Sequence, residues 1–281
     1  LVPNSSREQY NLACVLALKG EVDAALDWLG RAAANGFHQL PFLEADSDLE
    51  AVRDLPGYQI VRTMIAENRQ HWREEVYRTA ASAPPLTVLP EPTAGGKPHP
   101  LIIALHGFGD TAANYPRLWG PVAEDFGAIL VVPNGLRPVG AGRGWGSVDE
   151  AEAVVEAALD YARENFEVDW DRVVLTGFSQ GGFMAMALGT RHPDLFVGVI
   201  PMAGGYIPGI DTPPEADRGD PRYYFMVGSR DRAADEVRRA AADFEAAGYQ
   251  VDLRMLSGIG HTFPRRTTTE LRNALRFVLG E

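Results

Sequence analysis

Hydrophobic and polar positions follow two different periods along this chain of 281 residues. Up to about residue 77, apolar side chains recur three or four positions apart, which is typical of amphipathic helices. From about residue 86, short continuous apolar runs alternate with segments of helical period, and a stretch rich in Ala, Pro and Gly separates the two regions. The pattern predicts a small all-helical domain over residues 1–79 and an α/β domain over residues 80–281.

The helical region opens with two predicted helices that meet at a turn around Gly20, and the second ends at Asn35. A short helix over residues 49–53 and a longer one over about residues 58–77 are expected after them. The first two helices resemble one tetratricopeptide repeat in the positions of their small and large residues, which are Leu12, Ala13, Gly20, Ala25, Leu29 and Ala32. One repeat cannot bury its own apolar face. Residues 1–79 are therefore expected either to pack as an ordinary helical extension or to bind a protein partner or a second copy of the chain.

Apolar runs in the second region are predicted strands, with helices between most of them. The strand candidates, the first of them an edge strand, are residues 86–89, 101–105, 128–132, 172–176, 197–200, 223–227 and 251–255. The predicted helices between them include residues 150–165, 180–191 and 233–247. Continuous apolar strands joined by helices indicate a mostly parallel sheet flanked by helices, and sites in such sheets lie at the carboxyl ends of the strands.

A Gly-x-Ser-x-Gly motif, Gly177-Phe178-Ser179-Gln180-Gly181, lies where one predicted strand ends and a predicted helix begins. A sharp strand-to-helix turn is the context that a nucleophile elbow requires, and glycines on both sides of the serine let the backbone pack closely there. The alternative interpretation is a helix N-cap serine in a Rossmann-like turn. The motif makes Ser179 the candidate nucleophile.

A serine nucleophile needs a base and an acid, which follow it in the order Ser, Asp or Glu, His in this arrangement. Only two histidines follow Ser179. His261 lies in a loop directly after a strand, whereas His192 lies a full helix away from the serine. Asp231 comes just after the strand over residues 223–227, whereas its competitor Asp235 falls inside the next helix. We therefore expect a triad of Ser179, His261 and Asp231.

Two backbone N–H groups are candidates for an oxyanion hole. The N–H of Gln180 follows the nucleophile at a helix N-terminus, and the N–H of Phe108 lies in a glycine-containing loop after an early strand. That loop, His106-Gly107-Phe108-Gly109-Asp110, also contains a histidine that precedes the nucleophile. We expect His106 to order the loop rather than to take part in catalysis.

Together, the loop over residues 105–110, the motif over residues 177–182, Asp231 and the pair Gly260-His261 resemble the phospholipase/carboxylesterase family of α/β-hydrolases, which includes the acyl-protein thioesterases. The resemblance runs from about Leu86 to the C-terminus. It implies an α/β-hydrolase fold and a metal-independent serine carboxylesterase that acts on a small ester of short to medium acyl length, or on a thioester. Polyester and feruloyl esterases share a similar core.

The resemblance also implies that Trp145 lines the acyl pocket, with packing in the core as the alternative. Two features depart from the family. The helical N-terminal region is foreign to its minimal form, and the glycines over residues 140–144 predict an unusually flexible loop before Trp145. Two further hypotheses are a catalytically weak hydrolase-fold scaffold that binds partners through residues 1–79, and a peptidase or acyltransferase on the same fold.

Composition excludes several classes of function. The formal net charge is −12, from 26 Lys and Arg against 38 Asp and Glu, whereas nucleic-acid binding needs a basic face. The chain has no phosphate-binding loop, no His and Cys cluster with zinc spacing and no dinucleotide fingerprint, so neither a metal nor a cofactor is expected. No apolar run reaches membrane-spanning length.

The sequence leaves the cellular location open. No basic-then-apolar leader is visible, and Cys14 is the single cysteine, which slightly favours a reducing, cytoplasmic compartment. The chain does not begin with Met, so the removal of an upstream segment is an open alternative.

Overall fold

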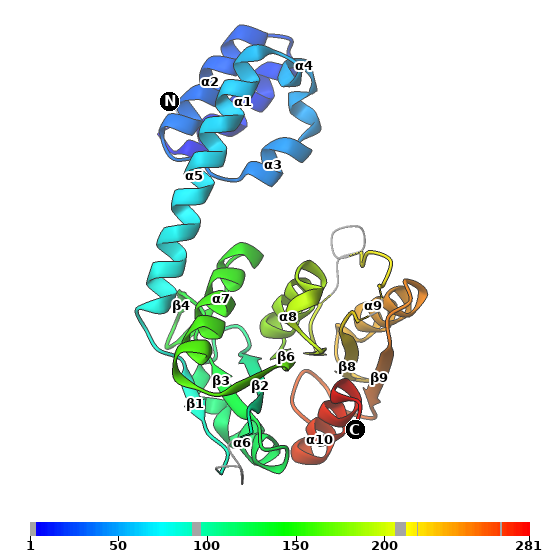
Figure 1. Ribbon diagram of the computed structural model, residues 1–281. Helices are drawn as coiled ribbons and strands as arrows, with labels where there is room; N and C mark the ends of the chain where they lie inside the picture. The colour runs from blue at the N-terminus through cyan, green and yellow to red at the C-terminus, as the bar shows by residue number, and fades with distance from the viewer. Residues whose placement is uncertain (1–3, 92–96, 206–211, 218, 265) are drawn as a thin grey trace. The chain divides into compact units, whose positions relative to one another are not determined.

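The chain divides into two compact units in a computed structural model, Leu1–Val76 and Tyr77–Glu281 (Figure 1). The structure describes residues 4–91, 97–205, 212–217, 219–264 and 266–281. Residues 92–96, in the stretch rich in Ala, Pro and Gly, lie outside the described residues. Each unit has its own hydrophobic core.

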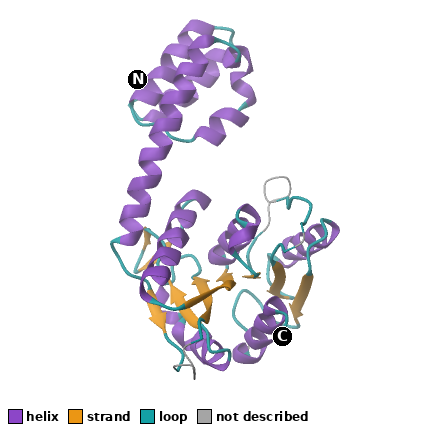
Figure 2. Ribbon diagram, viewed as in Figure 1, coloured by secondary structure: helices purple, strands orange, loops and turns teal. Residues whose placement is uncertain are grey.

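The first unit is all helical (Figure 2). Its elements are α1 (Ser6–Leu18), α2 (Val22–Ala34), α3 (Leu40–Ala45), the 3-10 helix η1 (Ser47–Leu49), α4 (Glu50–Arg53) and the beginning of α5 (Pro56–Ala81). Helix α1 begins with a capping box, in which the Ser5 hydroxyl accepts the Glu8 N–H and the Glu8 carboxylate accepts the Ser5 N–H. The four sequence-predicted helices are present, whereas the six-residue α3 was not predicted, because so short a helix has no measurable apolar period.

The core of the first unit contains a buried polar contact. Tyr10 is 1% exposed, stacks on Phe37 at 4.4 Å between ring centroids, and donates its hydroxyl proton to Asp46 at 2.6 Å. Burial and this hydrogen bond both raise the pKa of Tyr10, so the phenol stays protonated. A buried phenol needs such a partner. The contact therefore ties α1 to the segment before η1.

The second unit is built on a seven-stranded sheet of order β1-β3-β2-β6-β7-β8-β9. Its strands are β1 (Leu86–Val88), β2 (His99–Leu105), β3 (Ile129–Val132), β6 (Val168–Phe178), β7 (Gly198–Met202), β8 (Arg222–Gly228) and β9 (Val251–Leu256). Within this sheet, the edge strand β1 is antiparallel to its neighbour β3, and the other described pairs of neighbouring strands are parallel. The register places Leu101 beside Ile129 on one side and Val173 on the other. Strand β6 is therefore central, and its end carries Ser179.

Helices cover both faces of this sheet (Figure 1). Helices α7 (Val148–Asn165), α8 (Gln180–Arg191) and α9 (Ala234–Ala246) pack on one face, and α6 (Pro116–Asp125) and α10 (Thr267–Leu279) pack on the other. Short 3-10 turns, η2 (Ala112–Asn114) and η3 (Pro193–Leu195), lie in the connections. Buried strand residues alternate between the faces, so β2 reads as a continuous apolar run. Helix α6 was not predicted, because Pro116, Gly120 and Pro121 interrupt its pattern.

The glycine-rich segment before Trp145 is a β-hairpin of β4 (Arg137–Val139) and β5 (Gly142–Gly144), and not the flexible loop expected from the sequence. A Cβ at Gly142 would lie 2.0 Å from the carbonyl oxygen of Gly109. The glycine is needed for close backbone approach rather than for flexibility, and this corrects the expectation.

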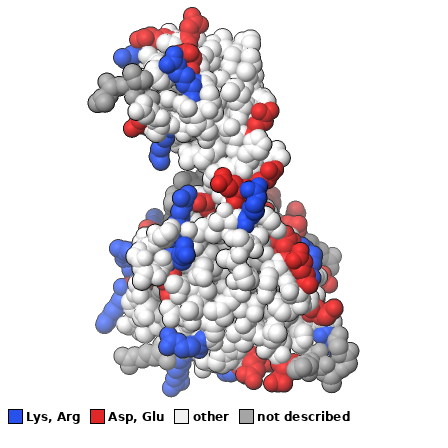
Figure 3. Space-filling view, turned by 90° about the vertical axis from the view of Figure 1, so that its left-hand side faces the viewer, with Lys and Arg blue, Asp and Glu red and all other residues white. Residues whose placement is uncertain are grey.

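Charged side chains are distributed on both units. On the face in Figure 3, acidic and basic side chains are interspersed, and its described residues form no continuous basic surface. No described helix is long and apolar enough to cross a membrane. The face in Figure 3 therefore offers no basic surface of the kind that phosphate backbones need.

Candidate active site

Ser179 occupies a sharp turn between β6, which ends at Phe178, and α8, which begins at Gln180. Its backbone has φ 55° and ψ −119°, and it is one of two non-glycine residues with positive φ in the described chain. The Ser179 N–H donates to the carbonyl of Met202 at 2.8 Å, which anchors the turn to the end of β7. Such a conformation costs about 1–3 kcal/mol and persists only where surrounding contacts impose it.

The two motif glycines are required by close backbone contacts. A Cβ at Gly177 would lie 2.2 Å from the carbonyl oxygen of Gly181, and a Cβ at Gly181 would lie 2.3 Å from that of Leu105. No side chain fits at such distances. The turn is therefore a strained strand-to-helix elbow, in which the serine is held at the carboxyl edge of the sheet.

His261 joins Ser179 to a buried carboxylate. The His261 Nε2 lies 2.8 Å from the Ser179 Oγ, and its Nδ1 lies 2.7 Å from the Asp231 Oδ2. The Asp231 side chain is wholly buried, and its Oδ1 accepts the Ala233 N–H at 2.9 Å. Because a carboxylate accepts, Nδ1 carries the proton and donates it to Asp231, which leaves Nε2 free to accept the serine hydroxyl proton. This is the arrangement of a nucleophile, a base and an orienting acid.

The loop that carries His261 is held by aromatic packing. The His261 ring lies 5.1 Å from the ring of Phe178, and Phe178 stacks on Phe263 at 4.5 Å. The preceding loop is also bonded, because the Gly258 N–H donates to the Ser229 hydroxyl at 2.9 Å. Neither phenylalanine was predicted to belong to the site, although Phe178 directly precedes Ser179 and Phe263 lies two positions after His261.

His192 and Asp235, the alternative candidates for the base and the acid, contact other residues. His192 ends α8, and its Nε2 lies 3.2 Å from a carboxylate oxygen of Glu152. Asp235 is exposed and pairs with Arg238 at 2.5 Å. Neither forms a hydrogen bond with Ser179 or His261 within the described residues.

His106 lies in the loop after β2 and is fully buried. Its Nε2 accepts the Gly135 N–H at 3.0 Å, and its Nδ1 donates to the Gly107 carbonyl at 2.8 Å. Burial lowers the pKa of this imidazole, which favours the neutral form that these two contacts require. The imidazole therefore bonds two backbone segments, one of them the loop of Phe108.

The loop of Phe108 also pairs with the β4–β5 hairpin. The Gly109 N–H donates to the Arg143 carbonyl, and the Arg143 N–H donates to the Asp110 carbonyl, both at 2.9 Å. A Cβ at Gly107 would lie 3.5 Å from the Cβ of Ser179, so the loop approaches the nucleophile closely. The hairpin thus supports the loop in which the first candidate oxyanion donor lies.

The candidate oxyanion donors, the N–H groups of Phe108 and Gln180, form no hydrogen bond to other described residues. The side chain of Gln180 has a separate role, because its Oε1 accepts the Trp145 N–H at 3.1 Å. The phenyl ring of Phe108 is 65% exposed and lies against the hairpin at Gly144. Both N–H groups are therefore free to donate a hydrogen bond to a substrate oxygen.

Trp145 belongs to the core and does not line a pocket at Ser179. Its side chain is 1% exposed, its Nε1 donates to the His106 carbonyl at 2.7 Å, and its ring lies 4.7 Å from that of His106. The expectation of an acyl-pocket wall is corrected, because the indole is used to position the loop after β2.

An open groove of about 590 Å³ runs past Ser179 and His261. Besides these two, its walls include Phe183, Met184, Ala203, Gly205, Arg232 and Glu236. None of these residues was predicted from the sequence to line the site, although Ala203 and Gly205 lie just after β7 at the carboxyl edge where sites form. No ion pair of Arg232 occurs among the described residues.

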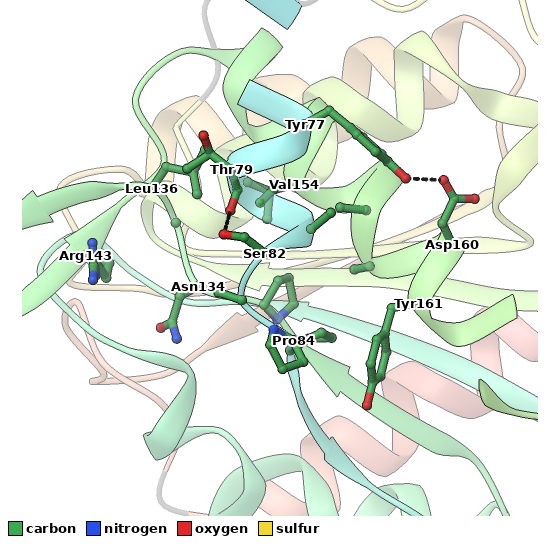
Figure 4. Close-up of a pocket in the computed structure, with 18 of the residues that line it drawn as sticks. Tyr77, Thr79, Ser82, Pro84, Asn134, Leu136, Arg143, Val154, Asp160 and Tyr161 are labelled. Carbon is green, nitrogen blue, oxygen red and sulfur yellow. Dashed lines mark hydrogen bonds between the residues drawn. The ribbon is translucent and has the colours of Figure 1, made fainter. Parts of the chain in front are cut away.

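A second cavity, of about 400 Å³, lies elsewhere in the second unit, between the end of α5, the segment after β3 and α7 (Figure 4). Tyr77 donates its hydroxyl proton to Asp160 at 2.7 Å on one wall. Prolines and alanines form much of the remaining wall, and Arg143 contributes from the hairpin. No nucleophile with an adjacent base lines this cavity, so the groove at Ser179 is the candidate site for chemistry.

A metal site needs several ligand atoms close together. Among the described residues, one group has three potential ligand atoms close together, formed by Cys14, Asp46 and Asp48 in the first unit. Asp46 already accepts hydrogen bonds from Tyr10 and Cys14, and burial raises the pKa of the Cys14 thiol to about 12. A protonated thiol is a poor ligand, and the group fits a structural network better than a metal centre.

The second unit matches a known protein family. Residues 84–262 match the family model Esterase, described as "Putative esterase". The chain belongs to this esterase family. The match covers the elbow, Asp231 and His261, and it begins after the helices of the first unit.

Three curated proteins illustrate the similarity of this chain to known sequences. "Putative esterase NocK" of Nocardia uniformis subsp. tsuyamanensis is 34% identical over 196 residues, 63% of this chain and 51% of that protein. "Poly(3-hydroxyalkanoate) depolymerase C" of Paucimonas lemoignei is 32% identical over 120 residues, 38% of this chain and 28% of that protein. "Feruloyl esterase C" of Emericella nidulans is 33% identical over 131 residues, 44% of this chain and 47% of that protein. The chain spans about half or less of the length of each of these proteins.

Solved structures share the fold. The crystal structure of esterase PE8 has a TM-score of 0.58 at 21% identity and covers 69% of this chain and 98% of its own. An uncharacterized protein from Bacillus cereus ATCC 10987 has a TM-score of 0.55 at 17% identity, and covers 99% of this chain and 89% of its own. The α/β-hydrolase fold predicted from the sequence, preceded by a helical region, is therefore confirmed.

Proposed function

We propose that this protein is a serine hydrolase of carboxylic esters, with Ser179 as nucleophile, His261 as base and Asp231 as the orienting acid. The observation that carries the proposal is the continuous hydrogen-bonded chain from the Ser179 Oγ through His261 to the buried Asp231. Membership of the esterase family supports the same chemistry.

In the first half of the reaction, the Ser179 Oγ attacks the ester carbonyl while His261 Nε2 takes the hydroxyl proton. The imidazolium that forms is stabilised by Asp231, whose carboxylate has no solvent exposure. Charge develops on the carbonyl oxygen, and the N–H groups of Phe108 and Gln180 donate to it. His261 then gives its proton to the departing alcohol oxygen, and an acyl-enzyme remains on Ser179.

In the second half, His261 takes a proton from water, and the hydroxide attacks the acyl carbonyl. The tetrahedral intermediate uses the same two N–H donors, and its collapse returns the proton to Ser179 as the acid leaves. The His261 side chain is 40% exposed, which gives water access to Nε2. The chain's own residues supply every proton transfer in this cycle.

The test is hydrolysis of 4-nitrophenyl butyrate by wild type and by Ser179→Ala. We expect the variant to lose at least about a thousandfold in kcat, because removing the nucleophile removes the covalent route. Ser257→Ala is the matched control, since Ser257 is an exposed serine in the loop after β9. A folded Ser179→Ala protein with wild-type turnover contradicts the proposal.

The second candidate function is that of a catalytically weak hydrolase-fold scaffold. It requires that Ser179 be unreactive. Labelling by a fluorophosphonate probe separates the two, because the probe reacts with an activated serine. Labelling of wild type and not of Ser179→Ala supports the hydrolase. Absence of labelling in folded wild type supports the scaffold.

The substrate proposed is an oxygen ester of short to medium acyl length. Relatives named as feruloyl esterases and poly(3-hydroxyalkanoate) depolymerases make a feruloyl or polyester substrate the first alternative. The resemblance of residues 105–110 and 177–182 to the phospholipase/carboxylesterase family makes a thioester the second. The groove of about 590 Å³ accommodates a small ester. A panel of 4-nitrophenyl esters of two to twelve carbons, with a feruloyl ester and a thioester of butyrate, ranks the three by kcat/KM.

We further propose that residues 1–79, which resemble a tetratricopeptide repeat, serve partner binding or self-association and form a domain separate from residues 80–281. Exposed apolar side chains in this region, at Val15, Leu18, Phe42 and Ile60, support a contact surface. Tyr77 forms a hydrogen bond with Asp160 of α7, so a truncation that removes the helical region should end before Tyr77. Sedimentation of wild type and Leu18→Glu compares their association directly.

A further inference from the structure

Two charged side chains line the groove at the nucleophile, and neither takes part in the triad. Arg232 follows Asp231 directly and is exposed, and Glu236 lies one turn further along at the start of α9. No described residue forms an ion pair with either, and the two do not pair with each other although they are four residues apart. Among the described residues, the Arg232 guanidinium therefore has no ion-pair partner, and it lines the same groove as Ser179 and His261.

The position of Arg232 in the groove matters because the net negative charge of the protein repels anions. The formal net charge is −12, so an anionic ester approaches against the overall potential. The nearest triad charge, Asp231, is wholly buried and already bonded to His261 and to the Ala233 N–H. Arg232 is therefore the local group that can offset the repulsion inside the groove.

We propose that Arg232 selects esters that carry a carboxylate near the scissile bond, and that Glu236 limits this selectivity by its opposite charge. The inference rests on the proposed function, since it names the substrate class of the same site. A guanidinium suits a carboxylate because its planar N–H donors bind both oxygens. The Glu236 carboxylate approaches the groove at Gly205, where a Cβ would lie 3.3 Å from Glu236 Oε2. It therefore repels the same anion from the side.

The experiment compares pairs of esters that differ in charge and match in length. The first pair is mono-4-nitrophenyl adipate and 4-nitrophenyl hexanoate, which places the carboxylate on the acyl side. The second pair is 3-carboxy-4-nitrophenyl butyrate and 4-nitrophenyl butyrate, which places it on the alcohol side. For each pair, the readout is the ratio of kcat/KM for the anionic ester to that for the neutral ester, corrected for uncatalysed hydrolysis.

We expect Arg232→Gln to lower this ratio about fivefold in at least one pair, and the pair that responds identifies the side of the ester that Arg232 contacts. Arg232→Lys should recover part of the ratio, because it keeps the charge and loses the two-pronged geometry. Glu236→Gln should raise the ratio. The matched control is Arg230→Gln, because Arg230 is an exposed arginine two positions away that does not line the groove.

Salt provides an independent readout. The wild-type ratio should fall between about 10 mM and 500 mM NaCl, and the ratio of Arg232→Gln should change less, because salt screens an exposed charge pair. Ratios in Arg232→Gln that match those of Arg230→Gln in both pairs overturn the inference while leaving the esterase activity standing. Folded wild-type protein that hydrolyses none of the four esters overturns the proposed function and the inference with it.

Discussion

The Nδ1 of His261 lies 2.7 Å from the Oδ2 of Asp231, although 30 residues separate them and they follow different strands. Asp231 follows β8 and His261 follows β9, and these strands are parallel neighbours at one edge of the sheet. Parallel pairing brings both loops to the same side of the molecule. The aspartate side chain is buried and the imidazole is partly exposed, which fits the roles proposed for them as orienting acid and as base.

Asp231→Asn should lower kcat for 4-nitrophenyl butyrate by at least about a hundredfold. An amide can donate to Nδ1 and so favours the tautomer in which Nε2 carries the proton and cannot accept one from Ser179. Asp235→Asn is the control, because Asp235 is exposed and pairs only with Arg238 among the described residues. Equal effects of the two variants on kcat argue against Asp231 as the orienting acid.

Ser179→Gly should be more stable than Ser179→Ala by about 1 kcal/mol, although both are inactive. The backbone at φ 55° and ψ −119° is strained for any residue with a Cβ, and glycine relieves the strain. The greater freedom of glycine in the unfolded chain offsets part of this gain. Chemical denaturation measures the difference, and an alanine variant as stable as the glycine variant would falsify the claim that the elbow is strained.

Gly142→Ala should lower kcat about tenfold to a hundredfold. A Cβ at residue 142 would meet the Gly109 carbonyl at 2.0 Å, so the loop of Phe108 must shift away from the hairpin. A displacement of about 1 Å in a catalytic donor can cost a hundredfold in rate. The control is Gly120→Ala in α6, where a Cβ meets no other atom within 4 Å. If kcat is the same in both variants, the hairpin does not position the oxyanion loop.

His106 should make the second unit less stable in acid. Burial lowers its pKa from the ordinary value of 6.5, so the unfolded chain binds the proton more readily than the folded one. The contribution of neutral His106 to the free energy of unfolding is therefore full above about pH 6.5 and declines as the pH falls below it. Denaturation of wild type and His106→Gln between pH 5 and pH 8 measures this, and their difference should shrink toward low pH. A difference that is constant over this range contradicts the assignment.

Much of the fold could be predicted because its elements have strong local signals. Strands such as β3 and β8 are continuous apolar runs, and helices such as α7 have a clear apolar period and a capping box. Weak elements were missed for physical reasons, as in α6, where two prolines and a glycine interrupt the pattern. The β4–β5 hairpin was predicted to be a loop, because its glycines serve contacts with residues distant in sequence.

The candidate site divides in the same way. The residue types and the order of Ser179, Asp231 and His261 could be predicted from the sequence. A strand-to-helix serine motif and polar residues at strand ends are local patterns. The residues that line the groove could not be predicted, because Ala203, Arg232 and Glu236 belong to no sequence motif. Only the fold of the sheet brings the end of β7 and the start of α9 beside the elbow. Trp145 shows the same limit, because only packing reveals that its indole donates to His106 rather than facing a substrate.

By itself, then, the sequence determined the α/β class of the second unit, the elbow at Ser179 and the polar residues that follow the strands, because each depends on neighbours within a few positions. The tertiary structure alone decided that His261 bonds both Ser179 and Asp231, that Trp145 lies in the core, and that Arg232 lines the groove with no ion-pair partner among the described residues. These facts depend on strand register and on close backbone approach between distant segments, and no local pattern encodes such distances.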